Sequence, residues 1–438
     1  MWLLPVLSGI LIGTSYIPFP PWASLFCFVP LWNFWMRQND SRRIFLGGWI
    51  TAFVLTLIGF NWVAYTLHEF AHLSWPLALL GLLLYAAAAQ WYVPVAGLVW
   101  YWLKTRLRYS PGLAVCLMGL ITALCDRNAL TLFDWNLGYA WYESNLPVYQ
   151  WAEWIGFSGL STVTVLLNIP CYLAWETRGE RTGRAWLVAV CVVFAALNAG
   201  GIWLVARLPA PDSALNVLLV QGNIGNEEKS AAELGQGFRD SIIDKYFALT
   251  DHALESRTET PVDLAVWPEA AFPAFIDPIY GSRDQFGALK EFVSERKIPL
   301  ITGGYGVDPA KEKITNSLFA LNAHGTLTRP HYSKTKLLAF GEYIPGIDWF
   351  PFLKEWLPPI GEYARGSGPT VLLRVNGYQI GPQICYESLF PEFSRGLADL
   401  GAQFIINVTN DSWYGQWQEP YQHLYMTLAR AVEYRRPV

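Results

Sequence analysis

The stretch Tyr378-Gln-Ile-Gly-Pro-Gln-Ile-Cys-Tyr-Glu-Ser388 decides the fold of the second half of the chain. The pair Asn376-Gly377 directly before it is typical of a hairpin turn, so residues 378–384 are predicted to form a strand that leads into Cys385. The other cysteines lie in apolar runs, where a thiol usually behaves as a small hydrophobic group: Cys27, Cys116, Cys125, Cys171 and Cys191. The thiol of Cys385 is therefore the one set apart for chemistry.

On either side of this stretch, short apolar runs alternate with amphipathic helical patterns. Strands are predicted over residues 215–220, 262–267, 300–304 and 404–408, a further hairpin turns around residues 322–325, and helices are predicted over residues 232–256 and 284–296. Such alternation indicates a layered α/β domain, in which functional sites gather at strand ends. Glu269 and Cys385 each follow the carboxyl end of a predicted strand, and Asn410 and Asp411 follow another.

The first half of the chain is predicted to be embedded in a membrane. Hydrophobic residues make up 53% of the sequence and tryptophan occurs 22 times, and the chain changes from mostly apolar to ordinary charge content near Leu208. Apolar stretches that can span a bilayer lie at about residues 2–18, 20–36, 44–67, 76–103, 112–125, 156–175 and 185–206. These limits predict a transmembrane domain of about seven helices over residues 1–207 and a second domain over residues 214–438.

Basic residues mark one face of the predicted membrane domain. Lysine and arginine near span ends favour the cytoplasmic side, and here they gather in alternate loops: Arg37, Arg42, Arg43, Lys104, Arg106, Arg108, Arg178, Arg181 and Arg184. The intervening loops carry almost none, which places the N-terminus in the cytoplasm and everything after Arg207 on the opposite side. The net charge of -4, without a basic cluster in the second half, argues against a nucleic-acid partner.

Two features of the outer loops have more than one interpretation. The aromatic residues of 126–154 form either an interfacial belt or the lining of a lipid-entry groove: Trp135, Tyr139, Trp141, Tyr142, Tyr149, Trp151 and Trp154. His68, Glu69 and His72 have a spacing that suits a metal ion, but polar caps on a helix end are the favoured interpretation. No metal and no organic cofactor is expected.

Glu269, Lys334 and Cys385, in this order along the chain, suit acyl transfer through a thiol. A thiol at a strand-to-helix turn beside a lysine is expected to gain thiolate character, and the lysine also stabilises the oxyanion that forms when a carbonyl is attacked. The carboxylate acts as general base if burial raises its pKa, and Val266-Trp267-Pro268 provides an apolar approach. Taken singly, each residue has an ordinary structural explanation, as a helix cap, a solvated charge or a buried filler.

The local contexts of these residues resemble a known family. The stretches Trp267-Pro-Glu269-Ala, Tyr332-Ser-Lys334-Thr-Lys-Leu-Leu-Ala-Phe-Gly-Glu342 and Ile384-Cys-Tyr-Glu387 look like the three signatures of the nitrilase, or carbon–nitrogen hydrolase, superfamily. With a multi-span membrane domain in front, the chain specifically resembles the apolipoprotein N-acyltransferase family. This resemblance implies that a multi-span helical membrane domain is followed by a nitrilase-like α/β domain, a four-layer α-β-β-α sandwich.

The resemblance also implies an activity. Cys385 takes an acyl group from a phospholipid as a thioester and passes it to the N-terminal α-amino group of a diacylglyceryl-cysteine apolipoprotein. By matching position, Glu269 is the base, Lys334 stabilises the oxyanion, Glu342 is a second essential carboxylate, and Tyr386 and Glu387 support the thiol. The implied location is the bacterial inner membrane, as a multi-pass protein with its catalytic domain on the periplasmic or outer face. A membrane-tethered amidase with the same triad, or a non-catalytic lipoprotein-binding relative, remains an alternative.

Three features extend or depart from the family pattern. Relatives commonly have an aromatic residue shortly after Gln221-Gly-Asn-Ile224, whereas this chain has Gly225-Asn-Glu-Glu-Lys229, so a substrate-gating contact is expected to be absent or supplied elsewhere. Residues 346–366 are apolar for a loop and are predicted to form a lid or a membrane-dipping arm, with buried packing as the alternative. Since the sequence stops at Val438, the C-terminal strands and last membrane span of the family are expected to be lacking.

Overall fold

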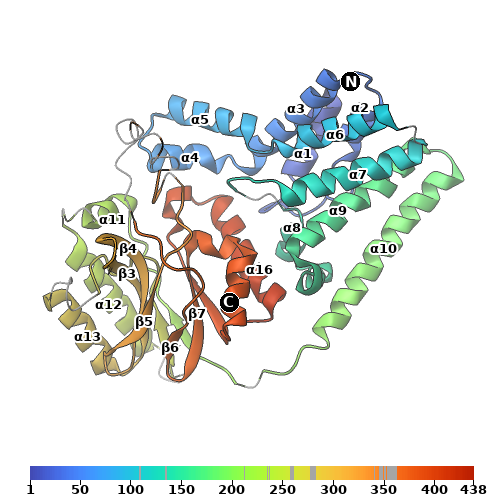
Figure 1. Ribbon diagram of the computed structural model, residues 1–438. Coiled ribbons are helices and arrows are strands. Elements are labelled where there is room, and N and C mark those ends of the chain that lie inside the picture. Colours follow the sequence, from blue (N-terminus) through green and yellow to red (C-terminus); the bar gives the residue numbers. More distant parts are fainter. Residues whose placement is uncertain are drawn as a thin grey trace. The chain divides into compact units, whose positions relative to one another are not determined.

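A computed structural model describes residues 1–107, 110–133, 136–211, 213–233, 235, 237–256, 261–276, 283–339, 341–344, 349, 352 and 363–438. The chain divides into two compact units (Figure 1). The helical unit comprises Met1–Pro209 and Tyr414–Glu433, and the catalytic unit comprises Ala210–Trp413 and Tyr434–Val438. The expected change near residue 208 is therefore present, and a second exchange occurs near the C-terminus. Most of the predicted lid over 346–366 lies outside the described residues.

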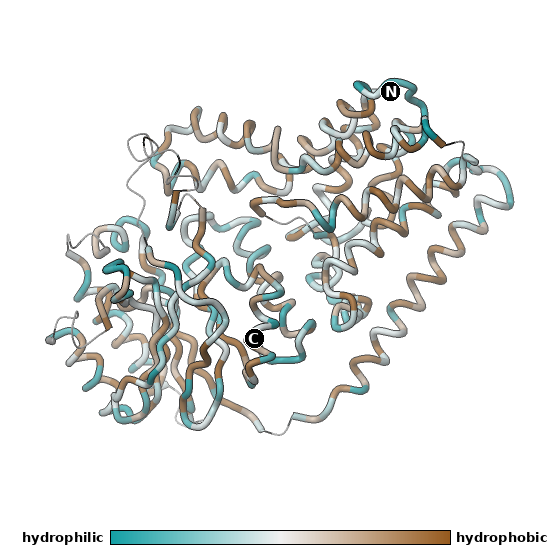
Figure 2. The backbone as a smooth tube through the Cα atoms, in the orientation of Figure 1, coloured by the Kyte–Doolittle hydropathy of each residue, from teal (hydrophilic) through white to brown (hydrophobic). Residues whose placement is uncertain are grey.

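The helical unit contains long apolar helices and several short ones. Its helices are α1 (Leu3–Gly13), α2 (Val29–Met36), α3 (Ser41–Gly59), α4 (Trp62–Glu69), α5 (Trp75–Ala88), α6 (Tyr92–Arg106), α7 (Pro111–Asn128), α8 (Gly138–Glu143), η1 (Pro147–Trp151), α9 (Ala152–Glu176), α10 (Arg181–Val205) and α16 (Glu419–Tyr434). Figure 2 shows hydrophobic residues in long runs along them. The unit is thus built as the apolar first half of the sequence predicts.

Four helical stretches among the described residues are long and apolar enough to cross a bilayer: Ser41–Gly59, Trp75–Arg106, Pro147–Glu176 and Arg181–Val205. In the last of these, α10, only 17% of the most apolar 18-residue stretch is buried inside the protein, as expected for a helix that faces lipid. The predicted number of about seven spans stays a prediction, because helices such as α1 are shorter than the roughly 20 residues that a span needs.

Buried polar side chains attach α16 to the other helices of its unit. Nε2 of Gln422 donates to the carbonyl oxygens of Ile17 and Gly59, both at 3.0 Å, and its Oε1 accepts a hydrogen bond from Nε1 of Trp62 at 3.2 Å. Gly59 ends α3 and Ile17 lies in the turn segment after α1, so neither carbonyl has a donor within a helix. The amide of Gln422 provides a donor to both.

Arg430, also on α16, is fully buried in the same unit. Its Nη1 lies 2.8 Å from Oε2 of Glu433, and its Nη2 donates to the hydroxyl of Tyr139 at 2.5 Å. Oε1 of Glu433 accepts a hydrogen bond from the main-chain N of Phe157 at 2.9 Å. That N–H is freed by the break in α9 at Gly156, which has φ of +68°. Glu433 therefore caps the second part of α9.

The aromatic residues of 126–154 do not share one environment. Tyr139 and Trp141 are buried, and Nε1 of Trp141 donates to Oγ1 of Thr164 at 2.8 Å. For these two rings the interfacial belt is the wrong interpretation, because they pack inside the helical unit. Trp154 is 71% exposed and remains suited to a belt.

The catalytic unit contains two sheets. The five-stranded sheet has the order β1 (Val217–Leu219), β2 (Leu264–Val266), β3 (Leu300–Asp308), β4 (Lys313–Leu321) and β5 (Leu327–Ser333), and the three-stranded sheet has the order β6 (Leu373–Val375), β7 (Tyr378–Ile384) and β8 (Phe404–Val408). The pairs β1–β2, β2–β3 and β7–β8 are parallel, whereas β3–β4, β4–β5 and β6–β7 are antiparallel. Both predicted hairpins are confirmed, and Asn376 and Gly377 have the positive φ values that a tight turn requires.

Alternation along the strands creates two apolar layers. Ala265 and Trp267 point to the side covered by α12 (Arg239–Ser256) and α13 (Arg283–Arg296), where Trp267 stacks on Tyr246 at 5.3 Å. Leu264 and Val266 point to the other side, toward the second sheet. The second sheet is covered in turn by α15 (Pro391–Asp399). The predicted α-β-β-α layering is confirmed.

Candidate active site

The sheet topology brings three predicted site residues to one end of the strands. Glu269 follows β2, Lys334 follows β5 and Cys385 follows β7. Because β3, β4 and β5 run antiparallel in turn, β5 points in the same direction as β2, and both end at the same edge. Nζ of Lys334 lies 3.1 Å from Oε1 of Glu269. Lys334 and Glu269 are therefore in direct contact, a pairing that the sequence did not predict.

Lys334 bridges two carboxylates. Its side chain is only 3% exposed, and its Nζ also lies 2.9 Å from Oε1 of Glu342. Nδ2 of Asn316 donates to the same two oxygens, at 2.7 Å for Glu269 and 3.2 Å for Glu342. These carboxylate oxygens thus accept hydrogen bonds from protein donors. Asn316 was not predicted, although polar residues inside a buried strand, Thr315-Asn-Ser317 on β4, were a signal.

The turn that carries Glu269 is held from two sides. A Cβ on Gly303 of β3 would come within 2.5 Å of the main-chain N of Ala270 and 2.6 Å of the carbonyl oxygen of Pro268, so only glycine allows this approach. From the other side, Nζ of Lys229 donates to the carbonyl oxygen of Glu269 at 3.3 Å. Lys229 lies on α11 (Asn226–Glu233), and its contact with this turn was not predicted.

Cys385 occupies a sharp turn between β7 and the short helix η2 (Cys385–Leu389). Its φ is +52°, a left-handed conformation that costs energy for a residue with a side chain and that tends to persist at functional sites. Its carbonyl oxygen accepts hydrogen bonds from Nδ2 of Asn407 at 3.0 Å and from Oγ of Ser388 at 3.1 Å. The strained turn is thus fixed by neighbouring side chains.

The protonation states differ from those expected. Burial raises the pKa of the Cys385 thiol well above its usual value, the charge of Glu269 raises it further, and the charge of Lys334 opposes this only in part. The expected thiolate character is therefore wrong for the resting site, because Lys334 is shared with two carboxylates. Burial lowers the pKa of Lys334, but the charges of Glu269 and Glu342 outweigh burial and hold this pKa well above its usual value.

Glu269 also departs from the expectation. Burial alone would raise its pKa, but the charges of Lys334 and Lys229 and hydrogen bonds from Asn316 and Lys334 outweigh burial and hold the pKa below its usual value. The expected rise in the pKa of Glu269 is wrong, because the sequence shows the apolar residues before Glu269 but not the two lysines that lie near it in space. The resting site therefore holds a neutral thiol beside an ionised carboxylate that can accept its proton.

Glu387 connects the lysine segment to the thiol turn. Its Oε1 accepts hydrogen bonds from the hydroxyl of Tyr332 at 2.5 Å and from the main-chain N of Thr335 at 2.6 Å and of Lys336 at 3.1 Å. Its Oε2 accepts one from the main-chain N of Ile384 at 2.9 Å. Residues on both sides of Lys334 and directly before Cys385 are thus tied to one buried carboxylate. Tyr386, by contrast, packs its ring edge-on against Phe390 at 4.9 Å.

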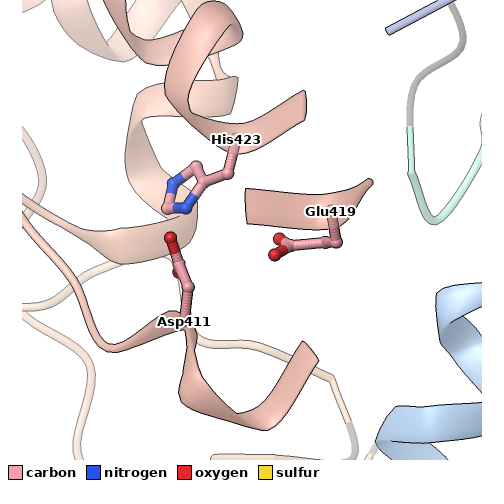
Figure 3. A group of neighbouring side chains, drawn as sticks. All are labelled: Asp411, Glu419 and His423. Atoms are coloured by element: carbon pink, nitrogen blue, oxygen red, sulfur yellow. The ribbon is translucent and has the colours of Figure 1, made fainter. Parts of the chain in front are cut away.

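Asp411 and Thr409 follow β8. Oγ1 of Thr409 donates to Oδ1 of Asp411 at 2.7 Å. The charge of Asp411 contributes to the raised pKa of Cys385, whereas a hydrogen bond from Thr409 opposes it. Figure 3 shows Asp411 together with Glu419 and His423, which lie one helical turn apart on α16.

Two family models and several solved structures are similar to parts of this chain. Residues 220–438 match the carbon-nitrogen hydrolase family, and residues 8–170 match the apolipoprotein N-acyltransferase N-terminal domain. Among solved structures, the carbon-nitrogen hydrolase from Helicobacter pylori G27 is 15% identical with a TM-score of 0.32, over 50% of this chain and 69% of that one. An amidase variant from Nesterenkonia sp. AN1 is 20% identical with a TM-score of 0.34, over 51% of this chain and 76% of that one.

Relatives in sequence cover almost the whole chain. The apolipoprotein N-acyltransferase of Bdellovibrio bacteriovorus is 42% identical over 99% of this chain and 81% of that protein. The apolipoprotein N-acyltransferase of Geobacter metallireducens is 30% identical over 100% of this chain and 82% of that protein. The chain therefore belongs to the apolipoprotein N-acyltransferase family.

Proposed function

We propose that this membrane acyltransferase takes a fatty acyl group from a phospholipid onto Cys385 and passes it to the N-terminal α-amino group of a diacylated apolipoprotein. The observation that carries the proposal is the contact of 3.1 Å between Lys334 and Glu269, whose charges both act on the thiol of Cys385. Family membership supports the class of acceptor and the need for a membrane.

In the first half-reaction, Glu269 takes the proton of the Cys385 thiol as sulfur attacks the ester carbonyl carbon of the phospholipid. The positive charge of Lys334 stabilises the resulting oxyanion. The carbon–oxygen ester bond then breaks, and the proton on Glu269 passes to the departing oxygen, which leaves a lysophospholipid and an acyl thioester. Glu269 is ionised again at the end of this step, as it is in the resting site.

In the second half-reaction, the neutral α-amino group of the apolipoprotein attacks the thioester carbonyl carbon. Glu269 accepts a proton from the amine and returns it to the sulfur as the carbon–sulfur bond breaks. The products are the N-acylated apolipoprotein and free Cys385. Both substrates are anchored in lipid, which gives the apolar helices of the helical unit a direct purpose.

We further propose that the protein resides in the bacterial inner membrane with its catalytic unit on the periplasmic or outer face. The alternation of basic loops along the first half of the sequence supports this orientation. Fusion of a reporter that is active only outside the cytoplasm, after Val438, tests it. Reporter activity agrees with the proposal, and an inactive but expressed fusion contradicts it.

The intact mass of the purified protein after incubation with phospholipid tests the chemistry. The wild type is expected to gain the mass of one acyl group, and to lose it to a diacylated lipopeptide that is added later. Cys385→Ser should gain none, whereas Cys116→Ser, which removes an exposed cysteine of α7, should behave as the wild type. Loss of the adduct without mass gain on the lipopeptide would favour the amidase, and no adduct on a folded wild type would favour the non-catalytic relative.

A further inference from the structure

Lys229 is a buried lysine on the short, mostly polar helix α11. Its neighbours on α11, Glu227 and Glu228, are exposed, but Lys229 itself is only 9% exposed. Lysine is rarely buried without a partner, because removing its charge from water is costly. Its Nζ donates a hydrogen bond to the carbonyl oxygen of Glu269 at 3.3 Å. The buried ammonium group of Lys229 therefore contacts the turn that carries Glu269.

The other end of α11 is attached to a second loop of the site. Nδ2 of Asn226 donates to the carbonyl oxygen of Ser412 at 3.3 Å, and Oγ of Ser412 donates to Oδ1 of Asn226. Ser412 also donates to Oδ1 of Asn410 at 3.0 Å. One turn of helix thus spans from the loop after β8 to the turn after β2, which limits how far Lys229 can move.

We propose that Lys229 is a positioning residue of the acyl transfer, which fixes the Glu269 turn by a hydrogen bond and supplies a second positive charge at that turn. The inference rests on the proposed function, because it assigns Lys229 a task for the general base of that reaction. It also explains what the segment Gly225-Asn-Glu-Glu-Lys229 contributes, where an aromatic residue was expected.

The charge balance shows why a second cation matters. The ionised groups at the base are Glu269 after β2, Glu342, Lys334 after β5 and Lys229 on α11, with Asn316 of β4 and the thiol of Cys385 as neutral neighbours. Two carboxylates against Lys334 alone leave a net charge of -1, and Lys229 brings the sum to zero. In agreement with this geometry, the charge of Lys229 helps to hold the pKa of Glu269 down.

Three substitutions separate the two tasks of Lys229. Lys229→Arg keeps the charge and the donor, Lys229→Gln keeps a donor without charge, and Lys229→Met keeps neither. Acyl-adduct formation is measured between pH 4 and pH 8 for each, together with the pH dependence of Tm, which does not require turnover. Lys290→Met, at an exposed lysine of α13, serves as the matched control.

For the Gln and Met variants, we expect the acidic limb of adduct formation to move up by roughly one pH unit, a tenfold loss of rate on that limb. The loss of Tm at acid pH that comes from Glu269 should become smaller, because the pKa of Glu269 in the folded protein then lies closer to its usual value. The Arg variant and Lys290→Met should keep the wild-type profiles, and the Met variant should also lose rate at pH 8.

Wild-type profiles in both the Gln and the Met variant would overturn the inference. A rate loss in the Met variant alone, with no shift in the pH dependence of adduct formation or of Tm, would overturn the electrostatic role of Lys229. Only its hydrogen bond to the Glu269 turn would then remain. If the Met variant does not fold, the Gln variant decides the matter by itself. If the wild type forms no adduct while the Tm profile still shifts, the proposed function fails and the contact between Lys229 and Glu269 stands.

Discussion

Replacing Lys334 with methionine tests the ion cluster directly. In the wild type, the Lys334 side chain is 3% exposed, and its Nζ lies 3.1 Å from Oε1 of Glu269 and 2.9 Å from Oε1 of Glu342. Methionine has a similar length but no charge, so it leaves two buried carboxylates that share Nδ2 of Asn316 as a donor. Removing one partner of a buried ion pair costs about 3–5 kcal/mol. We expect a loss of this size in Lys334→Met near pH 8.

The loss should depend on pH in a defined direction. In the wild type, the pKa of Glu269 lies below its usual value of 4.5, so its ionisation stabilises the fold above that pH and this stabilisation is lost as the pH falls through the folded pKa. In Lys334→Met, burial and the charge of Glu342 are expected to raise the pKa of Glu269. The variant is then penalised more as the pH rises, by up to about 1.4 kcal/mol per pH unit.

Thermal unfolding in detergent at pH 5, 6, 7 and 8 measures this difference. At about 2–4 °C per kcal/mol for a unit of this size, the Tm of Lys334→Met should lie roughly 10 °C below the wild type at pH 8 and only a few degrees below it at pH 5. Lys311→Met removes a lysine that is 54% exposed and lies 3.2 Å from Asp308, so its Tm should stay near the wild type throughout. An equal loss at pH 5 and pH 8, or none, refutes the reasoning.

Further substitutions test other contacts. Glu387→Gln should slow acyl-adduct formation at least about tenfold, because the main-chain N of Ile384 loses its carboxylate acceptor and the turn before the thiol loosens; the adduct rate from intact mass measures it. Arg430→Met should lower stability in detergent by about 3 kcal/mol, since Glu433 stays buried without its cation, whereas Tyr139→Phe should cost only about 1 kcal/mol. Gly377→Ala should cost about 1 kcal/mol in thermal unfolding, because its φ is +83°.

The parts of the fold that were predictable are those with a local cause. The turn at Asn376-Gly377 needs positive φ at two adjacent residues, and few pairs supply it, so the hairpin before Cys385 followed from the sequence. Strand β8 (Phe404–Val408) was predicted with the bounds that it has, because an apolar run is bounded by turn residues there. The three residues proposed for catalysis were found because each follows a strand within a family signature.

What escaped prediction depends on contacts between distant residues. Glu269 and Lys334 are 65 positions apart, and the sequence does not reveal that Lys334 is divided between two carboxylates. Its charge was therefore credited to the thiol, which led to the wrong sign for the pKa of Cys385. Lys229 has no local signature either, because a lysine in a polar helix looks like any solvated charge.

Helix α16 makes contacts that the sequence does not reveal. Its buried face contains Gln422, His423 and Arg430, which a hydropathy pattern reads as solvent-exposed. The segment lies within the predicted second domain and within the carbon-nitrogen hydrolase match, whereas its contacts group Tyr414–Glu433 with the helical unit. Hydrogen bonds such as those to Ile17 and Gly59 show where this face belongs.

That exchange of α16 between units limits how the protein can be dissected. A soluble fragment cut from residue 210 to Val438 would take α16 away from every partner of Gln422 and would leave the guanidinium of Arg430 without Tyr139. Such a fragment should aggregate and fold poorly, even if the turn that carries Cys385 is intact. Two polypeptides divided at the connector after Leu208 and produced together keep those bonds available in trans, so the split protein is the better route to separate handling of the two halves.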